Sequence, residues 1–135
     1  MATIVQTINS LPKLLKMTPA ESKDITEAEL KLRVSFAGEY KDYVLAFGAI
    51  LADGIELTGI AKSEHRDVVS VTNMARKLNP DVPKTMYVVE DTGVDGIVVW
   101  QDKSGAIYQT SPNAEPKEIA KTLTEYIEKR IKKGG

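Results

Sequence analysis

The spacing of apolar residues predicts a short helix at the start of the chain. The apolar positions are Ile4, Ile8, Leu11 and Leu15. They lie three or four residues apart, which is typical of one face of a helix. Pro12 argues against a continuous helix, and Pro19 ends the segment.

Two further helices are predicted before residue 50. Thr26 precedes Glu29 by three positions, which is the arrangement of a capping box, so a short helix is expected to begin there. A second apolar stripe consists of Tyr40, Tyr43, Val44 and Phe47. Gly48 can end this stripe in a left-handed cap, and we expect a helix over residues 38–47.

After this helix the apolar residues recur at every second position instead of every third or fourth. Asp53-Gly54 suits a tight turn, and the alternating residues after it predict a strand over 55–60. Residues 68–78 are ambiguous, because β-branched side chains favour a strand while the interspersed polar ones fit a helix surface. We favour a helix that Asn79-Pro80 ends.

The last part of the chain predicts a strand meander followed by a helix. The strands are expected at 86–91, 96–102 and 106–111, with connections short enough to make neighbours antiparallel. The apolar face of the final helix consists of Ile119, Leu123, Tyr126, Ile127 and Ile131. This order predicts a single α+β domain over residues 1–135, with an antiparallel sheet of about four to six strands covered on one side and flanked by N- and C-terminal helices.

Composition narrows the chemistry. Hydrophobic residues make up 42% of the chain and charged residues 27%, as in an ordinary folded domain. The absence of cysteine excludes disulfides, thiolate metal sites and a cysteine nucleophile, and a single histidine, His65, excludes a multi-histidine site within one chain. No phosphate-binding glycine loop is present, so neither a metal nor a cofactor is expected.

Charge and hydropathy guide the expectations about partners and location. The net charge of −1 argues against nucleic-acid binding. Charge is unevenly distributed, with five acids against one lysine in residues 86–115 and six bases against three glutamates in 117–133. Polar residues interrupt the first 16 positions, and no apolar run approaches the roughly 18 residues of a membrane span, so we expect a cytoplasmic protein without membrane contact.

Residues 36–48, FAGEYKDYVLAFG, resemble the hallmark segment of the SUKH superfamily, which contains the Smi–Knr cell-wall regulators and many bacterial immunity proteins. The matching positions are Glu39, Tyr40, Val44, Phe47 and Gly48, while Ala37 replaces the usual proline. The resemblance covers about residues 26–132 as a family-like core, after an N-terminal helix and connection at 1–25 and before a tail at 133–135.

The resemblance implies a function without catalysis. Similar bacterial proteins are immunity proteins that bind and neutralise a cognate toxin domain, often a nuclease, so a toxin protein is the expected partner. An adaptor or regulatory role in cell-wall or signalling assembly is the alternative that the same family implies.

Carboxylates can imitate the phosphates that a toxin nuclease binds, so acidic side chains in turns are the candidate partner-binding residues. The first candidates are Glu90, Asp91 and Asp95, followed by Asp53, Glu56 and Asp102. Trp100 and Tyr108 are candidate exposed anchors. Solvated turn acids and a core tryptophan are the competing structural interpretations.

One enzymatic alternative rests on Asp91-Thr92-Gly93, which resembles the active-site triplet of aspartic peptidases. In those enzymes two such aspartates share a proton. Glu90 places a charge where that family usually has an apolar residue, and the expected helices do not suit its all-β fold. His65 lies in a charged segment without the strained serine turn of a hydrolase triad, so no catalytic residue is expected.

Overall fold

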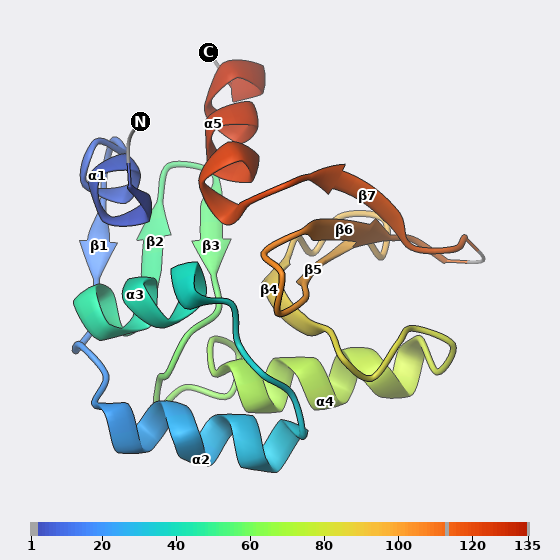
Figure 1. Ribbon diagram of the computed structural model, residues 1–135. Coiled ribbons are helices and arrows are strands. Elements are labelled where there is room, and N and C mark those ends of the chain that lie inside the picture. Colours follow the sequence, from blue (N-terminus) through green and yellow to red (C-terminus); the bar gives the residue numbers. More distant parts are fainter. Residues whose placement is uncertain (1–2, 113, 135) are drawn as a thin grey trace.

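Two antiparallel sheets and five helices make up the computed structural model, in which residues 3–112 and 114–134 are described (Figure 1). In chain order the elements are α1 Ile4–Asn9, β1 Leu15–Lys16, α2 Ser22–Leu32, α3 Gly38–Phe47, β2 Ile50–Ala52, β3 Ile55–Leu57, α4 Val68–Leu78, β4 Tyr87–Asp91, β5 Val98–Gln101, β6 Ile107–Thr110, β7 Lys117–Ala120 and α5 Leu123–Gly134. The predicted single α+β domain with N- and C-terminal helices is confirmed.

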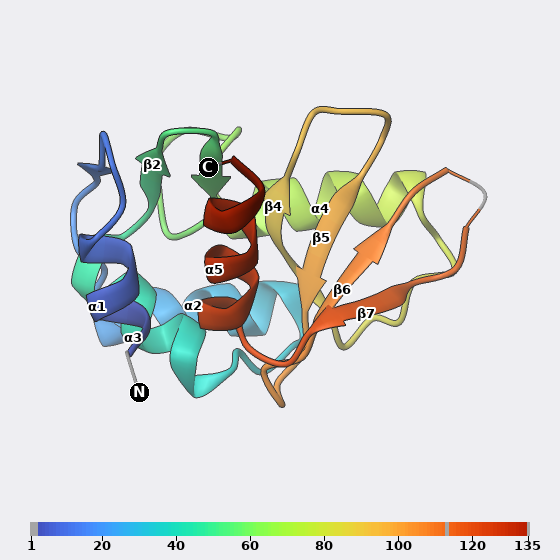
Figure 2. The same ribbon diagram turned by 90° about the horizontal axis from the view of Figure 1, so that it is seen from above.

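Each sheet is a meander of sequential strands. The first has the order β1-β2-β3, and the second has the order β4-β5-β6-β7. The predicted turn at Asp53-Gly54 joins β2 to β3, and Gly54 has a φ of 76°. A backbone hydrogen bond joins the two sheets where β3 ends, and in it the Thr58 N–H donates to the Val89 carbonyl at 2.9 Å. Seen from above, α5 lies between the first sheet and the second (Figure 2).

The second sheet is covered on both faces rather than on one. Val99 and Ile107 pack in the main core. Trp100 points the other way, into a smaller core that includes Ala75 of α4 and Val88. Successive residues of β5 therefore alternate between two buried faces, because side chains alternate along a strand. The expectation of a sheet covered on one side is wrong.

Buried tyrosines hold the main core together through their hydroxyls. The Tyr43 hydroxyl donates to the Thr58 carbonyl at 2.7 Å and accepts the Ile50 N–H at 3.1 Å. The Tyr87 hydroxyl donates to Gln101 Oε1 at 2.7 Å and accepts the Ala37 N–H at 3.0 Å. These bonds satisfy polar groups that would be costly to bury alone.

The buried tyrosines are expected to make the folded protein less stable at high pH. Burial raises the pKa of Tyr40, Tyr43, Tyr87 and Tyr126. Above about pH 10 the unfolded chain loses tyrosine protons that the folded protein retains, so the free energy of unfolding is expected to fall as pH rises further. Tyrosinate absorbance followed together with circular dichroism checks this expectation.

The half-exposed Tyr108 supplies the control for that titration. Burial raises its pKa too, but it is the tyrosine expected to ionise before unfolding. Tyr108→Phe should remove this early step and leave the cooperative one. Ionisation of all five tyrosines while the native dichroism persists would contradict the burial argument.

Helix α2 begins earlier than predicted. It starts at Ser22, where the Asp24 carboxylate accepts the Glu21 N–H at 3.1 Å. The Thr26 hydroxyl instead donates to the Ser22 carbonyl within the helix, and Glu29 accepts the Phe36 N–H at 2.8 Å. The predicted capping box at Thr26 is therefore wrong, because Asp24 satisfies an N–H at the start of the helix four residues earlier.

Both terminal apolar stripes divide between a helix and a strand. Leu15 lies in β1 rather than in α1, and Ile119 lies in β7 rather than in the final helix. Strand β7 pairs with β6, and the Thr122 hydroxyl accepts the Glu125 N–H at 3.0 Å at the start of α5. Leu15 and Ile119 have helical spacing with the neighbouring apolar residues, but this spacing wrongly placed both residues in a helix.

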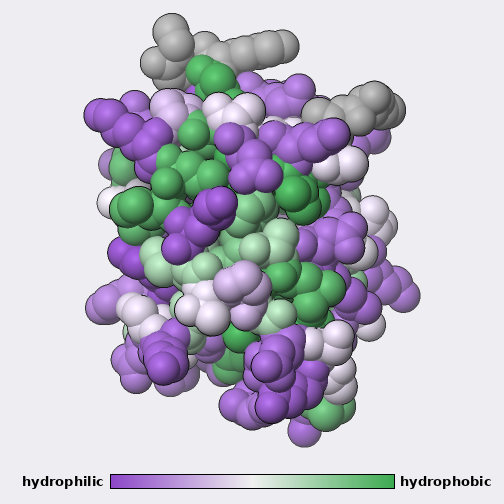
Figure 3. Space-filling model, turned by 90° about the vertical axis from the view of Figure 1, so that its left-hand side faces the viewer, coloured by the Kyte–Doolittle hydropathy of each residue, from purple (hydrophilic) through white to green (hydrophobic). Residues whose placement is uncertain are grey.

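Apolar side chains gather on the face that carries α1 and β1 (Figure 3). Leu15 is 61% exposed there, in the outer strand of the first sheet. This strand has only two residues. Such a short edge limits pairing with another chain.

Candidate functional site

The candidate site that contains several of the predicted acids is a cleft of about 990 Å³ where the two sheets diverge. The β2–β3 hairpin and β4 form one wall, and β7 and α5 form the other. Its aliphatic lining residues are Leu51, Ala52, Ile55, Val94, Ile97, Val99 and Ile119. Its charged lining residues are Glu56, Glu90, Asp91, Lys117, Glu118, Lys129 and Arg130. Such a surface, mainly apolar with charged groups at fixed places, suits ligand binding.

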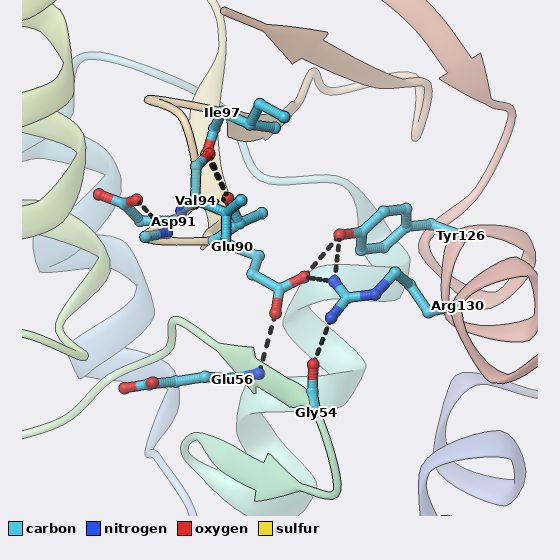
Figure 4. A network of polar contacts seen from close by, with 10 residues as sticks. Gly54, Glu56, Glu90, Asp91, Val94, Ile97, Tyr126 and Arg130 are labelled. Atoms are coloured by element: carbon cyan, nitrogen blue, oxygen red, sulfur yellow. Dashed lines mark hydrogen bonds and ion pairs between the residues drawn. The ribbon is translucent and has the colours of Figure 1, made fainter. Parts of the chain in front are cut away.

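Glu90 is the centre of a polar network in this cleft (Figure 4). Its side chain is buried, and the whole residue is 2% exposed. One carboxylate oxygen accepts from the Tyr126 hydroxyl at 2.5 Å and from the Arg130 guanidinium. The other accepts the Glu56 backbone N–H at 2.9 Å. One carboxylate therefore joins β3, β4 and α5.

Arg130 extends the network to the hairpin turn. Its guanidinium donates to the Tyr126 hydroxyl at 2.7 Å and also to the Gly54 carbonyl. Burial by itself would lower the pKa of Arg130, but the charge of Glu90 and the Tyr126 contact outweigh it and raise the pKa. Burial, followed by the charge of Glu90, raises the pKa of Tyr126. The arginine therefore stays charged and fixes α5 against the β2–β3 turn.

Glu39, in the segment that resembles the SUKH hallmark, positions the helix that carries these residues. Its carboxylate accepts the backbone N–H groups of Leu123 at 2.7 Å and Thr124 at 3.0 Å. It also accepts from the Thr124 hydroxyl and from Gln101 Nε2. A carboxylate at a helix N-terminus is stabilised by the unpaired N–H groups there. Glu39 thereby sets the direction in which α5 presents Tyr126 and Arg130.

The structure brings together three of the predicted site acids, since Glu56, Glu90 and Asp91 all line the cleft. Asp53 and Asp95 are exposed in the adjoining turns. Glu90 lies in a strand rather than in a turn and is not solvated, because it is buried within β4 and ion-paired with Arg130.

The other three candidates lie away from the cleft lining. Asp102 is half-buried and accepts from the Ser104 N–H at 2.9 Å, and Tyr108 is half-buried in β6. Trp100 is fully buried, and its indole N–H donates to Thr110 Oγ1 at 2.9 Å. The expectation that Trp100 is an exposed anchor is therefore wrong.

Sequence reasoning missed Glu39, Tyr126 and Arg130 as determinants of the cleft. Glu39 had a signal in its place within the hallmark segment, but its partner helix lies 84 residues further along the chain. Tyr126 had only the signal of the final apolar stripe. The Glu90–Arg130 pair spans 40 positions, and no local spacing indicates it.

The aspartate-threonine-glycine triplet forms a local turn. Asp91 Oδ1 accepts the Gly93 N–H at 3.1 Å, and the Thr92 hydroxyl donates to the Ile97 carbonyl at 2.8 Å. The mixed α+β fold also differs from the all-β fold of aspartic peptidases. Within residues 3–112 and 114–134, no group of three or more histidines, acids or cysteines is arranged to hold a metal ion.

The fold and the cleft define an α+β protein with an open cleft between two antiparallel sheets. The family model SUKH_5, described as SMI1-KNR4 cell-wall, matches residues 1–132, and the chain belongs to this SUKH family. The match includes the N-terminal segment that precedes the predicted core at residue 26. A search of the curated proteins found no match. None of the helices within the described residues is both long and apolar enough to span a membrane.

Proposed function

We propose that this protein is a non-catalytic immunity protein that binds and neutralises a cognate bacterial toxin domain in the cytoplasm. The observation that carries the proposal is the SUKH match over nearly the whole chain. The cleft supports it by offering a large surface that combines exposed apolar and charged side chains. Neither nucleic acid nor a membrane is part of the proposed complex.

Exposed acids give the proposed complex its electrostatic attraction. Glu56 and Asp91 are exposed in the lining of the cleft, and Asp53 and Asp95 are exposed in the adjoining turns. A toxin nuclease carries basic residues for its phosphates, so these carboxylates would speed the encounter and exclude substrate. Glu90 has a supporting role, because its charge is already paired with Arg130.

A second candidate is an adaptor in cell-wall regulation. The description of the matching family, SMI1-KNR4 cell-wall, favours it. A toxin gene directly upstream supports immunity, whereas a gene without such a neighbour supports the adaptor.

Co-expression tests the proposal. The toxin domain encoded beside this gene is induced in a sensitive host with and without this protein, and the pair is then co-purified. Immunity predicts rescue of growth together with a stable complex. Continued killing and no complex would exclude immunity against that toxin.

A further inference from the structure

We infer that the cleft between the β2–β3 hairpin and α5 receives a basic segment of the partner protein. This inference rests on the proposed function and specifies the part of the toxin that is bound. The evidence is the coincidence, in one open cleft, of an apolar lining and an acidic wall.

The apolar lining suits long aliphatic side chains. Val94 is 58% exposed at the rim, and Ile55, Ile97 and Ile119 continue the apolar surface inward. Lysine and arginine lay their aliphatic stems on such surfaces while their charged ends stay in water. A lysine- or arginine-rich segment can therefore cover this lining without burying its charge.

Charge favours a basic occupant on the hairpin side. Glu56 and Asp91 line this wall, and Asp53 and Asp95 are exposed next to lining residues Gly54 and Val94. Among the residues that the structure describes, the one charged partner of these acids is Arg66, which lies 3.6 Å from Glu56. Exposed ion pairs of this kind are weak, so a bound cation can replace Arg66.

The bases of the opposite wall are mostly engaged within the protein. Lys129 Nζ donates to the Ile119 carbonyl at 2.7 Å and lies 3.2 Å from a Glu125 oxygen. Arg130 is paired with Glu90. Lys117 makes no ion pair with the residues that the structure describes, so it is the cleft base expected to repel a basic segment.

Matched variants test the occupant and its charge. Val94→Arg places a charged side chain at the cleft rim, and Leu78→Arg makes the same change at a 78% exposed position of α4 outside the cleft. Glu56→Lys reverses a cleft charge, and Glu27→Lys makes the same reversal at another glutamate in an exposed ion pair. Lys117→Glu removes the repelling base. Each variant is titrated with the catalytically inactive toxin domain encoded beside the gene, at low and high salt.

The variants are expected to change the affinity for the toxin domain in opposite directions. Val94→Arg and Glu56→Lys should each weaken binding by about tenfold or more, while Lys117→Glu should strengthen it by about threefold at low salt. Leu78→Arg and Glu27→Lys should stay within about twofold of wild type. A complex with reversed charge effects, or one that all five changes leave unaltered, overturns the inference but leaves immunity standing. The absence of any wild-type complex overturns both.

Discussion

Replacing Glu90 by alanine is expected to reduce the free energy of unfolding by about 4 kcal/mol. The change removes the acceptor of the Glu56 N–H and of the Tyr126 hydroxyl, and leaves the half-buried Arg130 guanidinium without its counter-charge. Removing one partner of a buried ion pair reduces the free energy of unfolding far more than removing one partner of an exposed pair. Equilibrium urea unfolding measures the loss.

Two controls separate charge from shape at this position. Glu90→Gln keeps the size and one acceptor oxygen, so it should lose less stability than Glu90→Ala. The double change Glu90→Leu with Arg130→Met should recover much of the loss, because no lone charge remains buried. A Glu90→Ala protein within about 1 kcal/mol of wild type would show that the network does not fasten α5 to the sheets.

Adding one methyl group at Gly59 is expected to cost about 4 kcal/mol or more. A Cβ there would lie 1.8 Å from the Gly48 carbonyl oxygen and 2.8 Å from its carbon. The backbone has little room to move, because Gly59 N–H donates to the Arg66 carbonyl and the Gly48 carbonyl accepts the Ile60 N–H, each at 2.9 Å. Gly59→Ala should therefore separate the end of α3 from the chain after β3.

Gly38→Ala is the matched control for this substitution. It adds the same methyl group at the start of α3, where a Cβ meets nothing within 4 Å. Alanine also favours helix more than glycine does, so stability should stay level or rise by up to about 1 kcal/mol. Thermal unfolding of the two variants compares them. Equal stability of Gly59→Ala and Gly38→Ala would contradict the close approach of the two backbones.

The sequence predicted correctly those helices and turns that depend on residues close together in the chain. The helix over 38–47 and the turn at Asp53-Gly54 both carry strong signals of period and turn chemistry, and both are present. Strand β7 has only four residues, and the helical spacing from Ile119 to Leu123 concealed it. Short strands depend on their partners, here β6, rather than on their own residues.

The candidate site was only partly predictable for a related reason. Turn-borne acids such as Asp91 are visible in the sequence, and the structure places Asp91 at the cleft. The pairing of Glu90 with Arg130 joins segments that only the folded chain brings together. For Trp100 the sequence left an exposed anchor and a core residue both open, and the structure supports the core interpretation because β5 is buried on both faces.

The measurement that tests immunity by direct binding most directly is a stoichiometric titration of toxin activity with this purified protein. Binding without catalysis predicts that activity falls in proportion to added protein and reaches zero at one equivalent. Activity that stays constant through a large excess would contradict neutralisation. Full inactivation by a small fraction of an equivalent would contradict a binding mechanism and indicate an enzyme instead.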